Sequence, residues 1–180
     1  EMLIAVCAVV TSAIAVFIAW DQGRVMRAQQ HGAVWPVLEM DRQFSRSDNA
    51  TNFILKVENS GVGPALVSTA NYTLDGKKVP ESVAINDILL ANFAPPNQFT
   101  TADLSTRTIA PGKALEIIGL GWTDLAPAEV DELSSRWQRV GVEICYCSVF
   151  QRCWIDASGQ GSLPKPVSSC PVQITSETSP

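Results

Sequence analysis

The sequence predicts a mainly β protein, in which one N-terminal transmembrane helix precedes an antiparallel β-sandwich with two short helical insertions. Three observations predict this arrangement. Residues 2–20 carry no charge, later segments alternate apolar with polar residues, and 11 glycines and 11 prolines separate many short elements. Short sequential strands joined by tight turns favour an antiparallel sandwich over a parallel α/β plan.

The transmembrane prediction comes from the uncharged run MLIAVCAVVTSAIAVFIAW over residues 2–20. At about 1.5 Å per residue this run is roughly 28 Å long, close to the hydrocarbon core of a bilayer at about 30 Å. Trp20 ends the run with a side chain that favours lipid headgroups. A signal peptide is the alternative, but its apolar core is usually shorter. We therefore assign residues 1–20 to a transmembrane helix.

Small residues recur within this run at alternating spacings of three and four. They are Ala5, Ala8, Ser12, Ala15 and Ala19. Because lipid solvates bulky apolar side chains well, helices associate in membranes where small residues let their backbones approach closely. The mean spacing of about 3.5 suits a left-handed helix crossing. The sequence thus predicts a helix-packing seam, although an alanine-rich helix also produces such spacings by coincidence.

The boundaries of the remaining segments follow from helix-ending residues and changes in pattern. We expect a helical stalk over residues 21–33, which Gly32 and Pro36 bring to an end. The β-sandwich then occupies residues 34–172, and a polar tail occupies residues 173–180.

Strand patterns cover most of the predicted sandwich. Thr51–Asn59 alternates most clearly, with Phe53, Leu55 and Val57 on one face. Helical spacing instead predicts the two insertions, at Glu81–Asn92 and Pro127–Trp137. Further strands are predicted in an apolar run through residues 72–74, from residue 108 up to the Pro111-Gly112 turn, and at residues 114–122, 140–149 and 152–155.

Several of these motifs occur together in one group of proteins. The chain combines an N-terminal apolar run, Val34-Trp35-Pro36, a strand that ends in Asn59-x-Gly61-x-Gly63-Pro64-Ala65, and a Pro111-Gly112 turn. In this combination it resembles uncharacterised bacterial single-span membrane proteins with an immunoglobulin-like β-sandwich. The resemblance implies an immunoglobulin-like fold and membrane anchoring, and it implies no activity.

Four cysteines, Cys145, Cys147, Cys153 and Cys170, form the best candidate for chemistry. Cys145 and Cys147 point to the same strand face two residues apart, which is poor geometry for a mutual bond. Two pairings stay open: Cys147 with Cys153 and Cys145 with Cys170, or Cys145 with Cys153 and Cys147 with Cys170. We interpret them as structural disulfides, because their spacing matches neither a zinc site nor a redox motif.

The remaining inventory argues against an enzyme and predicts no cofactor and no metal. His31 is the one histidine and falls in the stalk, so a catalytic relay within the sandwich would lack its base. The pairs Gly61-x-Gly63 and Gly119-x-Gly121 lack the third glycine of a dinucleotide loop and are predicted to be turns. Acids near residues 124–132 fit helix capping. A net charge of −5 argues against a nucleic-acid partner, so none is predicted. Trp35, Trp122, Trp137 and Trp154 are predicted to lie in the core.

These observations predict a non-catalytic accessory or structural subunit. Its helix would cross the lipid bilayer once and dock on transmembrane helices of a larger membrane complex. A tethered binding or assembly module is the alternative, with the Pro95-Pro96-Asn97 loop or an open sheet edge as its contact surface. A thiol- or metal-handling protein is a third possibility.

The expected location is a bacterial inner membrane, with the domain on one side. Arg24 and Arg27 follow the span and favour a cytoplasmic domain. The four clustered cysteines favour the oxidising periplasmic side, which we prefer.

Overall fold

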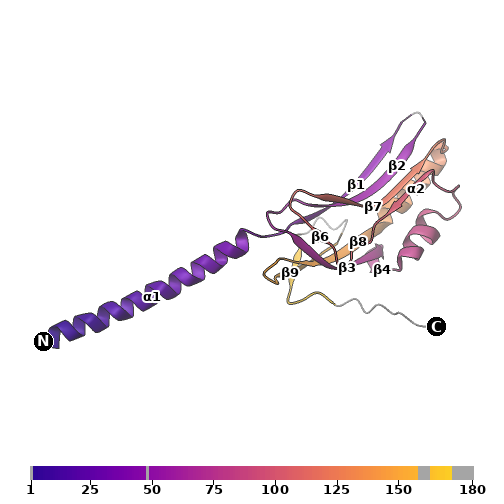
Figure 1. The fold of residues 1–180 in the computed structure, drawn as a ribbon. Helices are drawn as coiled ribbons and strands as arrows, with labels where there is room; N and C mark the ends of the chain where they lie inside the picture. The colour runs from indigo at the N-terminus through magenta and orange to yellow at the C-terminus, as the bar shows by residue number, and fades with distance from the viewer. Residues whose placement is uncertain (1, 48, 158–162, 172–180) are drawn as a thin grey trace.

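A computed structural model describes residues 2–47, 49–157 and 163–171 of the chain, without the side chains of residues 2–6, 8 and 9. A long helix, α1 (Met2–Gly32), projects from a β-rich body (Figure 1). The body contains two antiparallel sheets, which confirms the mainly β prediction. The polar tail predicted at residues 173–180 lies outside the described residues.

Helix α1 ends at Gly32, as its predicted stop signals require. Among the described residues, no helix combines the length and the apolar character needed to cross a membrane. Residue 1 and the side chains of residues 2–6, 8 and 9 lie outside that description, and they include Ala5 and Ala8 of the predicted seam. The transmembrane assignment of residues 1–20 therefore stays a prediction.

Among the described residues, the first sheet has four strands and the second has six. Every pairing within them is antiparallel. The first sheet runs in the order β1 (Leu38–Arg46), β2 (Thr51–Asn59), β7 (Ala114–Trp122), β5 (Gln98–Thr101). The second runs in the order β10 (Lys165–Val167), β9 (Cys153–Ala157), β8 (Val140–Cys147), β3 (Ala65–Leu74), β4 (Lys77–Lys78), with β6 (Thr108–Ile109) also paired to β3.

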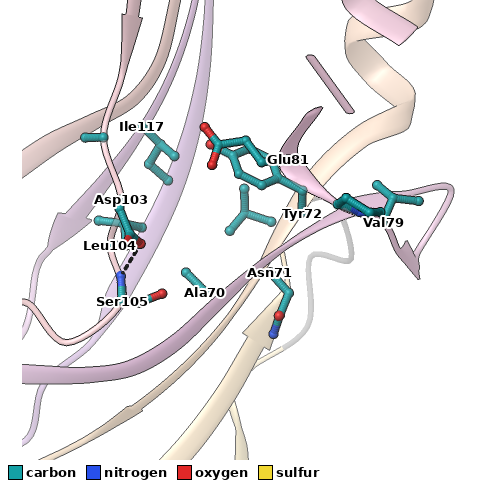
Figure 2. Close-up of a pocket in the computed structure, with 12 residues that line it drawn as sticks. Ala70, Asn71, Tyr72, Val79, Glu81, Asp103, Leu104, Ser105 and Ile117 are labelled. Atoms are coloured by element: carbon teal, nitrogen blue, oxygen red, sulfur yellow. Dashed lines mark hydrogen bonds between the residues drawn. The ribbon is translucent and has the colours of Figure 1, made fainter. Parts of the chain in front are cut away.

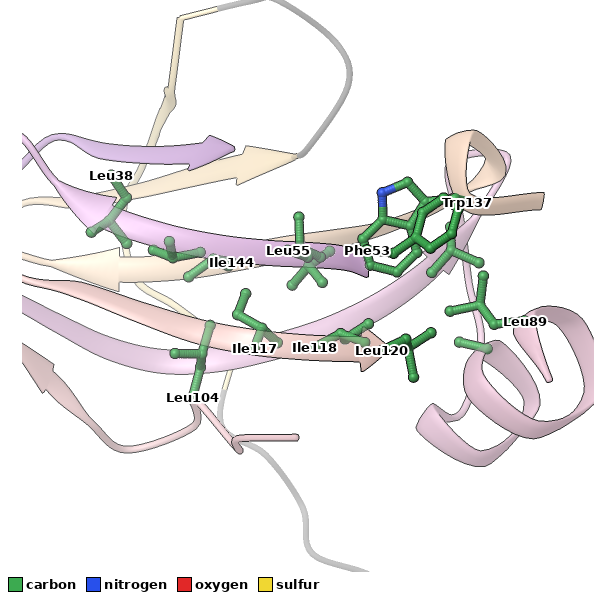
Figure 3. Packing of buried hydrophobic residues seen from close by; sticks show 14 of the residues in the cluster. Leu38, Phe53, Leu55, Leu89, Leu104, Ile117, Ile118, Leu120, Trp137 and Ile144 are labelled. Carbon is green, nitrogen blue, oxygen red and sulfur yellow. The ribbon is translucent and has the colours of Figure 1, made fainter. Parts of the chain in front are cut away.

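The two sheets share one hydrophobic core, to which β2 contributes most regularly. Its residues alternate between buried and half-buried, and Phe53, Leu55 and Val57 are at most 1% exposed. Ile144 from the second sheet joins the same cluster (Figure 3). Burying such alternating faces against each other is the main favourable term in folding this domain.

Both predicted helical insertions are present. The first is a π-helical segment, η1 (Val83–Leu89), and the second is α2 (Pro127–Arg139). Arg136 of α2 donates hydrogen bonds to the carbonyl oxygens of Ile88 and Ala91, at 3.0 and 2.6 Å. These bonds satisfy carbonyls at the end of η1 and hold the two insertions together at one end of the sandwich.

The glycine pairs behave differently from each other. Gly61 and Gly63 form the predicted turn after β2, and a Cβ on either would overlap the backbone of residues 34–37. The prediction of a turn at Gly119 and Gly121 is wrong, because both lie inside β7. A Cβ there would approach side-chain oxygens, that of Glu116 at Gly119 and that of Asn52 at Gly121.

The tryptophans divide between core and surface. Trp122 and Trp137 are buried as predicted, at 3% and 5% exposure, and Trp154 packs against the core from its edge. The prediction for Trp35 is wrong, since its side chain is 51% exposed. It stacks on Trp154 with ring centroids 6.3 Å apart, which places it outside the space between the sheets.

Candidate functional site

The first candidate surface lies on the part of α1 that projects from the domain. The bulky apolar side chains Val10, Ile14, Phe17 and Trp20 are between 51% and 73% exposed. Figure 1 shows why, because the helix extends away from both sheets. At its base, His31 meets the Phe150 ring edge-on with centroids 5.1 Å apart. A large exposed apolar surface of this kind marks a contact with a membrane or another protein.

The described part of the predicted seam lies on one face of this helix. At about 100° per residue, Ser12, Ala15 and Ala19 fall within a sector of roughly 60°, opposite Val10 and Ile14. All three seam residues are exposed. The described part of the seam therefore forms a shallow strip of small side chains on the side of the helix opposite the bulky apolar face.

The Thr11 side chain forms a hydrogen bond within its own helix. Its hydroxyl donates to the carbonyl oxygen of Cys7 at 2.9 Å. A bond to the carbonyl four residues earlier is common for threonine in helices. The Thr11 hydroxyl is therefore engaged inside α1 in this structure.

The second candidate is the cysteine cluster at the β8–β9 hairpin. The structure contains the disulfides Cys145–Cys170 and Cys147–Cys153, which is the first of the two pairings left open by the sequence. Strand register explains the choice, because β9 places Cys153 directly opposite Cys147. Cys145 is two residues away on the same face, where Cys170 reaches it.

The two disulfides contact each other. The sulfur atoms of Cys147 and Cys170 are 3.7 Å apart although neither is bonded to the other. The sulfurs of Cys147, Cys153 and Cys170 all lie within 4.8 Å of one another. While both disulfides are formed, they link the two strands of the hairpin to each other and Cys170 to β8. The bonded sulfurs then offer no thiolate to a metal.

The third candidate is a cavity of about 280 Å³ between the sheets (Figure 2). Tyr72, Glu81 and Asp103 line it, and Asp103 accepts a hydrogen bond of 2.8 Å from the backbone nitrogen of Ser105. Burial raises the pKa of the Tyr72 hydroxyl, and the nearby charges of Glu81 and Asp103 raise that pKa further. This phenol stays neutral and is able to donate a hydrogen bond.

No sequence pattern predicts this cavity. Tyr72 lies in β3, Glu81 precedes η1, and Asp103 follows β5. No short spacing joins these residues, so only the pairing of distant segments brings them together. The cavity holds two acids and a phenol, and its described lining contains no histidine or cysteine.

A second cavity, of about 470 Å³, is lined by charges that already have partners. Arg139 pairs with Asp75 at 2.7 Å, and Arg42 donates to the Val140 carbonyl oxygen at 2.7 Å. The hydrogen bond from Arg139 lowers the pKa of the Asp75 carboxyl. These contacts tie α2 to the sheets, so the arrangement is structural.

The predicted capping acids behave as helix-stabilising groups. Glu129 accepts a hydrogen bond of 2.8 Å from the backbone nitrogen of Ala126 at the start of α2. Glu132 pairs with Arg136 one turn later. The Glu129 contact confirms the predicted capping for that residue, whereas Glu132 forms an ion pair that the sequence did not predict.

Comparison with known proteins adds no relative. No family model matches the chain, and neither the curated proteins nor the solved structures contain a match. The immunoglobulin-like resemblance therefore stays a prediction, and the functional residues are identified from their positions in the fold.

Proposed function

We propose that this protein is a non-catalytic accessory or structural subunit that docks on a larger membrane protein complex through α1. The observation that carries this proposal is the projecting helix, whose bulky apolar side chains from Val10 to Trp20 are exposed. In water, exposing this surface is unfavourable, whereas lipid or apolar helices would cover it. The uncharged run at residues 2–20 supports the same conclusion.

The β-sandwich then forms the extramembrane part of the subunit, with an immunoglobulin-like arrangement of its strands. The two disulfides support a periplasmic position, because disulfides persist in oxidising compartments. The two disulfides also hold the β8–β9 hairpin and Cys170 together, which suits a domain that covers or steadies a partner.

The test uses matched substitutions on opposite sides of α1. Ala15→Leu places a bulky side chain in the seam, whereas Ala13→Leu adds the same side chain outside the seam sector. Each full-length variant is purified in mild detergent from the cells that make it, and the co-purifying proteins are quantified. Ala15→Leu should reduce the amount of co-purifying complex by about tenfold or more. A tenfold loss corresponds to about 1.4 kcal/mol of binding free energy.

Two results would contradict the proposal. Equal retention of the complex by both variants would show that the seam is not part of the interface. Recovery of the unmodified chain in the aqueous fraction after detergent-free lysis and high-salt washing would show that the protein is not attached to a membrane.

The open edge of the first sheet favours a second candidate function, a tethered binding or assembly module. Among the described residues, β5 pairs with β7 alone, and all four of its residues are exposed. Phe99 in this strand is 52% exposed. An extended peptide adds to such an edge through backbone hydrogen bonds, and a half-exposed aromatic side chain supplies an anchor.

The two edges of this sheet provide a matched test. Phe99→Lys alters the β5 edge, whereas Phe44→Lys alters a 49% exposed phenylalanine on β1 at the opposite edge. A bound client should be lost with Phe99→Lys and kept with Phe44→Lys in co-purification. If both variants keep the client, β5 is not its binding edge.

A further inference from the structure

The four disulfide-bonded cysteines differ in their exposure to solvent. Cys145 and Cys153 are buried, at 3% and 6% exposure, whereas Cys147 and Cys170 are half-buried. Each disulfide thus joins one buried residue to one more accessible residue. The two accessible residues are also the pair whose sulfurs are 3.7 Å apart.

We propose that this cluster is a thiol–disulfide exchange site that takes two electrons from a dithiol. The exchange moves the disulfide partner of Cys170 from Cys145 to Cys147. The dithiol is a small molecule or the vicinal cysteine pair of a redox protein. This activity is additional to the proposed docking role and does not depend on it.

The first step is reduction of Cys147–Cys153. A thiolate of the dithiol attacks the Cys147 sulfur, the Cys147–Cys153 bond breaks, and the Cys153 thiolate leaves and takes a proton. The second thiol of the reductant then attacks its own mixed disulfide, which releases the Cys147 thiolate and leaves the reductant as a disulfide.

The surroundings of Cys153 direct the next step to Cys147. The Cys153 sulfur lies 3.6 Å from the carbonyl oxygen of Gln151. That oxygen can accept a hydrogen bond from the Cys153 thiol once the disulfide is reduced. Cys147 is more exposed than Cys153, and its sulfur lies 3.7 Å from that of Cys170, so Cys147 carries the attacking sulfur.

The second step is an exchange within the protein. The Cys147 thiolate attacks the Cys170 sulfur at 3.7 Å, the Cys145–Cys170 bond breaks, and Cys145 leaves as a thiolate that takes a proton. The products are a Cys147–Cys170 disulfide and thiols at Cys145 and Cys153. Cys170 stays attached to β8, but its disulfide bond moves along the strand by two residues.

The first experiment follows the exchange in the full chain carrying Cys7→Ser, which removes the one free cysteine of the described residues. One molar equivalent of dithiothreitol is added anaerobically, and samples are alkylated over time. Fragmentation of the tryptic peptide covering residues 140–152 then locates the label. The label should appear first on Cys147 and later on Cys145. A label that stays on Cys147 throughout would overturn the proposal.

A second experiment needs no reductant. Cys153→Ser leaves Cys147 as a permanent thiol, whereas the control Cys147→Ser leaves Cys153 instead. In the Cys7→Ser background, the first variant should form the Cys147–Cys170 disulfide in part, and the control should keep Cys145–Cys170. Exclusive Cys145–Cys170 in both variants would overturn the proposal. Equal exchange in both would also overturn it, because the Cys147–Cys170 contact would then have no special role.

Discussion

The side-chain amide of Asn59 donates a hydrogen bond of 2.9 Å to the carbonyl oxygen of Ile109, fifty residues later in the chain. The same amide donates to the Gly63 carbonyl oxygen at 2.8 Å, and its oxygen accepts from the backbone nitrogens of Val37 and Gly61. Asn59 is fully buried. One side chain therefore joins the start of the sandwich, the turn after β2 and strand β6.

We expect Asn59→Asp to destabilise the domain by about 3 kcal/mol. The substitution keeps the shape of the side chain but replaces two amide donors with an acceptor that faces two carbonyl oxygens. Urea denaturation at pH 7 measures the loss. Ser60→Ala, on the exposed neighbouring residue, serves as the control and should change stability by less than about 0.5 kcal/mol. Equal effects of both substitutions would show that the Asn59 network contributes little.

Two phenylalanines opposite each other on β1 and β2 provide a test of the core. Phe53 is fully buried and packs on Trp122 and Trp137, whereas Phe44 is half-exposed. Phe53→Ala should cost about 3–5 kcal/mol, because it leaves a cavity between the sheets. Phe44→Ala should cost about 1 kcal/mol, the scale of one aromatic cross-strand contact. Thermal unfolding of both variants checks this order.

The two disulfides should stabilise the domain unequally. Their sequence separations are 25 for Cys145–Cys170 and 6 for Cys147–Cys153. In the chain-entropy model, removal costs about 3.5 kcal/mol for the longer loop and about 2 kcal/mol for the shorter one. Replacing both cysteines of a pair with serine avoids exchange with the other pair. Denaturation without reductant should place the Cys145/Cys170 double variant lower in stability, and the reverse order would contradict the prediction.

Asp156 should make stability fall as the pH rises. Burial of this β9 carboxyl raises its pKa in the folded state, although a hydrogen bond from the backbone nitrogen of Ala157 opposes the shift. The folded state therefore binds the proton more tightly than the unfolded state does. The destabilisation is absent below the unfolded pKa and complete above the raised folded pKa.

The measurement compares Asp156→Asn with the unmodified chain in urea between pH 3 and 7. The variant should gain relative stability as the pH rises through the folded pKa of Asp156. Asp131→Asn removes the same charge from an exposed position on α2 and controls for net charge. A parallel pH profile for the two asparagine variants would contradict the assignment to Asp156.

Elements with a strong local pattern could be predicted from the sequence. The bounds of β2 and β7 match the prediction. Strand β2 alternates apolar with polar residues, as the pleat of a half-buried strand requires, whereas β7 is predicted from a largely apolar run. Helix α2 begins at Pro127, where proline and the acids of the first turn act locally. The Asp75-Gly76 turn has φ values of 50° and 79°, as its residue types favour.

Elements that depend on distant partners could not be predicted in the same way. Strands β5 and β10 have few residues, and β5 is exposed throughout, so neither carries a local alternation signal. The glycines of β7 look like turn residues, but pairing with β2 and β5 places them inside a strand. Trp35 is apolar and aromatic, yet its position at the edge of the domain leaves it half-exposed.

For the candidate sites, the sequence by itself determined the uncharged N-terminal run and the set of four cysteines, because both are properties of residue type and spacing. Only the tertiary structure decided which cysteines pair, since register sets Cys153 opposite Cys147 and leaves Cys145 for Cys170. It also brought Tyr72, Glu81 and Asp103 around one cavity. Contacts across distant strands depend on how the sheets pair and pack, and no local pattern encodes them.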